Sequence, residues 1–154
     1  MVHYFLDSSA LIKRYITEQG TVWVRSITLP SAGHTIILAQ VTQVEIVSGV
    51  VRRRREGFIP PRTAQAIRLL LHRHLKREYM VIELTTLIIQ DAEDLLDKHP
   101  LRAYDAIQLA SALTANTRLT EAALAPLIFV SADVRLLTAA TAEGFTVEDP
   151  NAHP

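Results

Sequence analysis

The sequence predicts an α/β protein in which a parallel sheet is covered by helices on both faces. Short apolar runs, each the length of a buried strand, alternate along the chain with longer segments whose apolar residues recur at helical spacing. The chain has 154 residues, of which 49% are hydrophobic, and this is enough to build one substantial core. We therefore expect residues 1–154 to form a single domain.

Five apolar runs are expected to form the strands, because they are short and rich in β-branched and aromatic residues. The run that includes Phe5 has the character of a strand buried on both faces. The expected strands are residues 2–6, 35–39, 80–84, 127–130 and 145–147.

The segments between these runs are expected to form helices, with apolar residues on one face of each. Pro60 and Pro61 begin one helix, Gly57 and Gly144 follow the ends of two others, and Thr86 is expected to cap a fourth. In the helix at 21–29 we expect Val22, Trp23, Ile27 and Leu29 to be buried. The expected helices are residues 10–16, 21–29, 42–55, 63–79, 87–98, 101–116 and 134–143.

The composition excludes several classes of site. The 16 basic and 16 acidic residues give a net charge of zero, so binding to nucleic acid would have to depend on local patches. The chain has no cysteine, which excludes disulfides, thiolate zinc sites and thiol nucleophiles and fits a cytoplasmic location. No apolar run is long enough to span a membrane, and Asp7 interrupts the N-terminal run too early for a signal peptide.

Four carboxylates are placed near one edge of the predicted sheet. Asp7 follows the first strand, Glu45 opens the helix after the second, and Asp133 follows the fourth. Asp105 lies within the helix expected at 101–116, among apolar residues, where an unpaired acid is costly. Ligands of parallel sheets bind at the carboxyl edge, so we expect these four side chains to meet there.

Three of these acids also have a specific structural interpretation, whereas Asp105 is harder to explain in that way. Asp7 and Asp133 stand where a helix N-cap is expected. Thr42 and Glu45 have the spacing of a capping box, in which the glutamate reaches back to the threonine amide. If all four acids gather instead, their mutual repulsion requires a cation, and oxygen-only ligands favour Mg²⁺ or Mn²⁺. Such a site suits hydrolysis of phosphodiester bonds.

Four sequence segments, in this order and at these spacings, resemble PIN-domain ribonucleases, and more narrowly the VapC toxins of type II toxin–antitoxin pairs. The resemblance covers nearly the whole chain, and no acid of the motif is missing. The segments are residues 5–11 (FLDSSAL), 44–46 (VEI), 104–110 (YDAIQLA) and 130–133 (VSAD), the last leading into Leu136-Leu137 and Glu143-Gly144.

The resemblance implies a sheet of order 3-2-1-4-5, an Mg²⁺- or Mn²⁺-dependent endoribonuclease that leaves a 5′-phosphate, and a toxin silenced by a small cognate antitoxin. It implies a homodimer as well. By the same resemblance Asp7, Glu45, Asp105 and Asp133 are the catalytic, metal-binding acids. Ser9 matches a hydroxyl residue that supports the first acid, and Ser131 stands where the family often has threonine.

Basic residues are the candidates for contact with RNA. Arg52 and Arg53, within the run of four arginines, and Arg14 could bind phosphates. The alternative for the run is a solvated helix end, where cations suit the helix dipole. Two other functions stay open: a non-catalytic PIN-like module that binds RNA or protein, and an aspartyl-phosphate phosphatase. The phosphatase usually needs a second acid two residues after the first, where this chain has Ser9.

Overall fold

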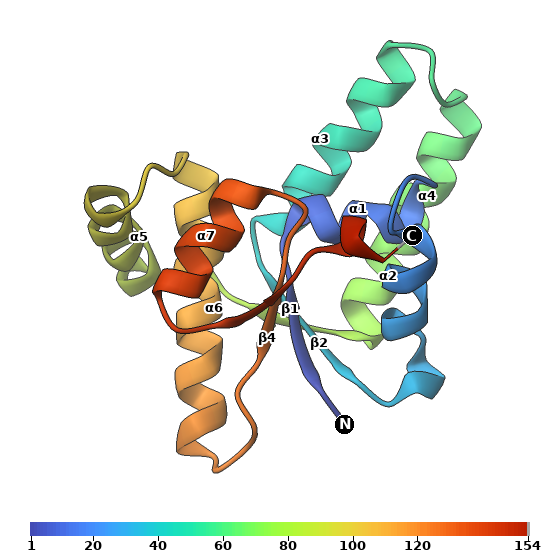
Figure 1. The fold of residues 1–154 in the computed structure, drawn as a ribbon. Helices are drawn as coiled ribbons and strands as arrows, with labels where there is room; N and C mark the ends of the chain where they lie inside the picture. The colour runs from blue at the N-terminus through green and yellow to red at the C-terminus, as the bar shows by residue number, and fades with distance from the viewer. Residues whose placement is uncertain (154) are drawn as a thin grey trace.

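A single parallel sheet forms the centre of the computed structural model, which describes residues 1–153 (Figure 1). Its strand order is β3-β2-β1-β4-β5, as the family resemblance implied, and β1 lies in the middle. Parallel pairing aligns Phe5 of β1 with Ile37 of β2 and with Phe129 of β4. The strands are β1 His3–Leu6, β2 Thr35–Ala39, β3 Tyr79–Ile82, β4 Ile128–Val130 and β5 Thr146–Glu148.

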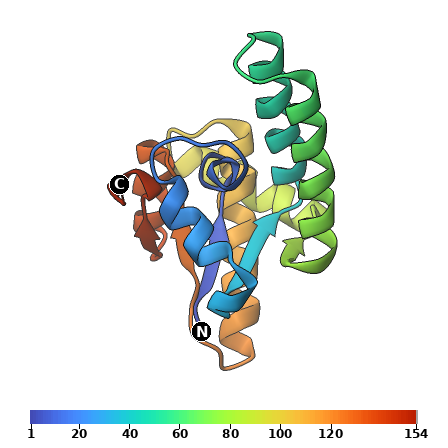
Figure 2. The ribbon, with the colours of Figure 1, turned by 90° about the vertical axis from the view of Figure 1, so that its right-hand side faces the viewer.

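Helices cover both faces of the sheet, as predicted (Figures 1 and 2). One face carries α5, α6 and α7, and the other carries α1 to α4. Within the residues that the structure describes, none of the helices combines the length and apolar character needed to cross a membrane. The helices are α1 Ser8–Tyr15, α2 Thr21–Thr28, α3 Thr42–Arg55, α4 Pro61–Arg77, α5 Thr86–Lys98, α6 Ala103–Glu121 and α7 Val134–Ala142, with short 3-10 turns at Pro30–Ala32 and Pro150–Ala152.

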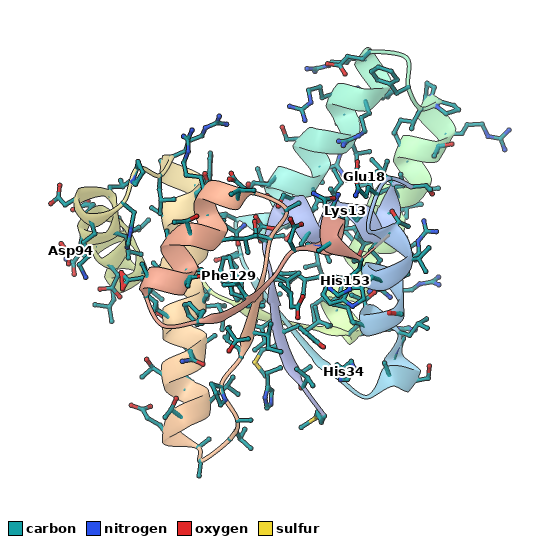
Figure 3. All side chains as sticks on the ribbon, viewed as in Figure 1. Lys13, Glu18, His34, Asp94, Phe129 and His153 are labelled. Carbon is teal, nitrogen blue, oxygen red and sulfur yellow. The ribbon has the colours of Figure 1, made fainter. Side chains whose placement is uncertain are left out.

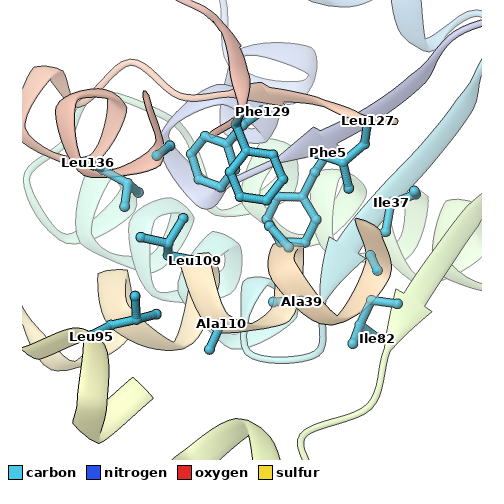
Figure 4. Packing of buried hydrophobic residues seen from close by; sticks show 14 of the residues in the cluster. Phe5, Ile37, Ala39, Ile82, Leu95, Leu109, Ala110, Leu127, Phe129 and Leu136 are labelled. Carbon is cyan, nitrogen blue, oxygen red and sulfur yellow. The ribbon is translucent and has the colours of Figure 1, made fainter. Parts of the chain in front are cut away.

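The core on the α5–α7 face is built around aromatic rings from neighbouring strands (Figure 4). Phe5 stacks on Phe129 with ring centroids 5.5 Å apart, and Phe129 contacts Phe145. Leu109 of α6 and Leu136 of α7 are fully buried against them. Alternation along β1 and β4 sends Leu6 and Val130 to the opposite core. Burial on both faces explains why these strands are nearly continuous apolar runs.

The α3–α4 pair extends beyond the carboxyl edge of the sheet, whereas the C-terminal turn folds back beside α1 and α2 (Figures 1 and 2). Gln19 donates to the carbonyl of Asn151 at 2.8 Å, and His153 stacks on Trp23. Gly20 adopts φ +82°, and a Cβ there would lie 2.4 Å from the carbonyl oxygen of Pro150. The C-terminal turn therefore closes over the loop between α1 and α2.

Two local predictions were wrong. In α2, Val22 and Leu29 are exposed, whereas Val24 is buried with Ile27; the buried face includes small polar residues, so the apolar pattern alone misplaced it by part of a turn. The cap of α5 is Thr85, whose hydroxyl accepts from the amide of Ile88, and not its neighbour in the sequence. Two adjacent threonines gave the sequence no means to choose between them.

Candidate active site at the carboxyl edge of the sheet

The first and fourth strands bring two of the predicted acids to the point where the strand order reverses. Asp7 follows β1 directly, and its amide donates to the carbonyl of Val130, the last residue of β4, at 3.1 Å. Asp133 lies three residues further along from β4. In an open parallel sheet this switch point is where a crevice forms and ligands bind.

Asp7 is 3% exposed, and hydroxyl groups surround its carboxylate. Oδ1 caps α1 by accepting from the amide of Ala10 at 2.9 Å. Ser131 Oγ donates to Oδ2 at 2.7 Å, and Ser9 Oγ lies 2.8 and 2.9 Å from the two oxygens. Burial raises the pKa of Asp7 to about 7, and the charge of Glu45 adds to the rise, although the three hydrogen bonds oppose it. Asp7 is thus an N-cap and also a carboxylate whose ionisation is costly.

Glu45 does not form the capping box that its spacing allowed. The N-cap position of α3 is Val41, and no side chain caps that helix. The Glu45 carboxylate accepts instead from Ser8 Oγ of α1 at 2.7 Å and from Gln108 Nε2 of α6 at 2.9 Å. Gln108 Nε2 also donates to Thr42 Oγ1 at 2.8 Å. Glu45 is therefore held between helices from both faces of the sheet.

Asp105 and Asp133 lie at the starts of two helices. Asp133 Oδ1 accepts from the amides of Arg135 and Leu136 and caps α7. Asp105 lies in the first turn of α6, because that helix begins at Ala103, so our expectation of an acid in a helix interior was wrong. Partial burial raises the pKa of Asp105, and the charges of Asp133 and Glu45 raise it further.

The carboxylates therefore influence one another's pKa: the charge of Glu45 raises the pKa of Asp7, and the charges of Asp133 and Glu45 raise that of Asp105. Within residues 1–153 none of them forms an ion pair with lysine, arginine or histidine. In the same residues no three histidine, cysteine or acidic side chains lie close enough to hold one ion. The donors are all hard oxygens, and among the described residues only the charge of Arg102 beside Asp105 opposes the repulsion among them. Their chemistry fits Mg²⁺ or Mn²⁺, but their present positions do not complete a ligand set.

A cleft of about 600 Å³ opens between α1, α3 and the start of α6, and Glu45 is the one of the four acids that lines it. Arg52 and Arg53 lie in its wall, as do Arg102 and Tyr104, which the sequence analysis did not single out. Arg14 does not line this cleft. Its guanidinium donates to Tyr79 and, at 2.7 Å, to Glu78, on the side of α1 that faces α4.

Sequence reasoning gave no role to Ser8 or Gln108, although both hold Glu45. One signal was present for Gln108. It lies three residues after Asp105, on the same face of α6, among residues that are otherwise apolar. A buried amide in such a position needs polar partners, and α3 supplies them for Nε2, whereas Oε1 has no hydrogen-bond partner among the described residues.

Comparisons with known proteins agree with this fold. The chain is similar in structure to VapBC2 from Rickettsia felis, bound to a DNA fragment from its promoter, with a TM-score of 0.65, 12% identity, and coverage of 96% of this chain and 98% of that chain. It is similar to a toxin–antitoxin complex from Klebsiella pneumoniae, with a TM-score of 0.60, 18% identity, and coverage of 96% and 97%.

The VapC20 toxin of Mycobacterium tuberculosis, described as cleaving the sarcin-ricin loop, gives a TM-score of 0.61 at 15% identity, with coverage of 93% of this chain and 96% of that chain. A comparison with curated proteins finds no match. The PIN domain family model matches residues 4–140, which include all but the first residue of β1, the switch point and all four acids. This match over most of the sequence shows that the chain belongs to the PIN domain family.

Proposed function

We propose that this protein is a metal-dependent endoribonuclease and acts as the toxin of a type II toxin–antitoxin pair. One observation carries the proposal: Asp7 and Asp133 follow the two strands at the switch point, the charge of Glu45 raises the pKa of both Asp7 and Asp105, and none of the four acids forms an ion pair among the described residues. Such an arrangement is unfavourable unless a cation offsets the charge. The family membership and the toxin structures with the same fold support this interpretation.

In this proposal Asp7, Glu45, Asp105 and Asp133 hold Mg²⁺ or Mn²⁺. The ion would supply Lewis acidity, activating water and offsetting charge on the phosphodiester. Ser9 and Ser131 orient Asp7 through the hydroxyl contacts at 2.7–2.9 Å. Ser8 and Gln108 orient Glu45 in the same way.

The cleft is where RNA would lie. Exposed Arg52 and partly buried Arg53 line its wall and would hold the phosphate backbone. We do not assign this role to Arg14, because it does not line the cleft. An antitoxin partner belongs to the same proposal, supported by toxin–antitoxin complexes of the same fold. A homodimer belongs to it through the family resemblance alone. Light scattering on the purified protein tests the homodimer, and identification of a small protein that co-purifies with it tests the antitoxin.

A non-catalytic module that binds RNA without cutting it is the second candidate. It is favoured by one observation, that among residues 1–153 no three acids are positioned to hold a single ion. The phosphatase has no comparable support. Both oxygens of Asp7 accept hydrogen bonds, and its side chain is buried, so it is not presented to a substrate as a nucleophile would be.

Cleavage of labelled RNA in Mg²⁺, Mn²⁺ or EDTA tests the proposal. The wild type should cut only with metal, and Asp7→Asn and Asp105→Asn should each lose most of this activity. Asp94→Asn is the matched control, because Asp94 is an exposed acid on α5, well away from α1 (Figure 3). Binding without metal-dependent cleavage would instead support the non-catalytic module.

A further inference from the structure

A second charged cluster lies in the wall of the same cleft, outside the four acids. Lys13 of α1, Glu18 of the following loop and Arg53 of α3 form two linked ion pairs. Lys13 Nζ donates to Glu18 Oε1 at 3.1 Å, and Arg53 Nη2 donates to Glu18 Oε2 at 3.4 Å. Each oxygen of one carboxylate thus serves one cation, and Figure 3 shows Lys13 and Glu18 beside each other near α3.

Lys13 is an unusual residue to find buried. It is 5% exposed, and lysine is almost never buried unless it is paired. Glu18 is the acid within ion-pair distance of it. The Glu18 backbone is fixed, since its amide donates to the Thr21 hydroxyl at 2.9 Å. Its side chain is 31% exposed, so the carboxylate can turn into solvent and leave Lys13 facing the cleft.

The cations lie further along the same helices that hold the acids. Lys13 is one turn beyond Ser9 on α1, about 6 Å along the axis, and Arg53 is two turns beyond Glu45 on α3, about 12 Å along. The cleft lining therefore has Glu45 at the end nearer the sheet and Lys13 and Arg53 further out, with Arg102 at the start of α6. A metal ion would suit the inner end, and a phosphate would suit the outer end.

Gly49 allows the two helices to approach closely at this point. A Cβ on Gly49 would lie 2.8 Å from Ile12 Cδ1 and 3.3 Å from Arg53 Nη1. Arg53 Nη1 donates to the Gly49 carbonyl at 3.2 Å, which fixes the guanidinium against its own helix. The position of the Arg53 guanidinium is therefore set by its own helix at the point where α1 and α3 approach closely.

We propose that Lys13 and Arg53 bind a backbone phosphate of RNA next to the bond that is cut, and that Glu18 occupies this subsite in the free protein as an internal competitor. The two oxygens of a carboxylate that bridges two cations resemble the two non-bridging oxygens of a phosphodiester. Each of the two anions carries one negative charge. This inference rests on the proposed nuclease function.

Glu18→Gln tests the competitor role, because it keeps the size of the side chain and removes its charge. Two cations and one carboxylate leave one net positive charge, and the variant leaves two. We expect it to bind single-stranded RNA of about 12 nucleotides about three- to tenfold more tightly at about 0.1 M salt, with a steeper salt dependence. KM should fall while kcat is unchanged.

Lys13→Met should weaken the same binding at least about threefold, with circular dichroism confirming that both variants fold. Glu143→Gln is the matched control, because Glu143 pairs with Lys98 and His99 outside the cleft; it should leave binding unchanged. Weaker binding by Glu18→Gln would overturn the competitor role and make Glu18 a positioning residue. Wild-type cleavage that neither Glu18→Gln nor Lys13→Met alters would overturn the subsite, whereas absent wild-type cleavage would count against the nuclease function itself.

Discussion

Replacing Asp7 by asparagine should make the protein more stable in the absence of metal, and the gain should grow with pH. The folded protein raises the pKa of this carboxyl from 3.8 to about 7. Above pH 3.8 the unfolded chain releases the proton while the folded chain keeps it. The contribution of Asp7 to the free energy of unfolding of the wild type is therefore highest below pH 3.8, falls as pH rises, and reaches its low value above about pH 7. Asparagine does not ionise and serves equally well as an N-cap.

The size of the effect follows from the shift in pKa. A rise of about three units corresponds to about 4 kcal/mol at alkaline pH, since each unit is worth about 1.4 kcal/mol. Between about pH 5 and about pH 8 the difference in unfolding free energy between Asp7→Asn and wild type should grow by about 2–3 kcal/mol in favour of the variant. Urea titrations in EDTA, followed by circular dichroism, measure this difference directly.

Saturating Mg²⁺ should reverse this order at about pH 8, because an ion that binds the folded wild type stabilises it and the variant has lost a ligand. If the two proteins instead show parallel pH profiles from about pH 5 to about pH 8, the buried carboxylate of Asp7 carries no penalty. The reasoning that a cation is needed at the switch point would then be refuted.

Two further substitutions probe how the fold supports the site. Gln108→Leu should lower the unfolding free energy by about 1–3 kcal/mol and reduce kcat, because Thr42 and Glu45 both lose a buried hydrogen-bond donor. Unchanged values in urea titration and in cleavage assays would contradict this. Gly20→Ala should lower Tm more than Gly33→Ala, since both have positive φ but only the first Cβ would strike Pro150; equal melting temperatures would contradict it.

The architecture could be predicted from the sequence because burial on both faces leaves a strong signal. The central strands β1, β2 and β4 are largely apolar runs, and Asp7 and Asp133 follow the adjacent strands β1 and β4. The order of those strands came from family resemblance, since alternation alone allows several topologies. Helix ends were less predictable, and Asp105 changed from an expected interior position to the first turn of α6.

The contacts of the site were harder to predict because they join distant parts of the chain. The capping-box spacing of Thr42 and Glu45 indicated a local contact, but Ser8 and Gln108, from two other helices, take both oxygens of Glu45. The pairing of Lys13 with Glu18 spans only five residues, yet it depends on how the loop after α1 returns toward α3. Neither contact has a period or motif that marks it in the sequence.

Calorimetric titration of Mn²⁺ into the protein without RNA tests the central claim most directly. The account predicts saturable binding to the wild type at about pH 8, lost in Asp7→Asn and in Asp105→Asn and retained in Asp94→Asn, whose acid lies on α5. Absence of saturable binding to the wild type, or equal binding by Asp7→Asn, would contradict the claim that the coupled carboxylates at the switch point take up a divalent ion.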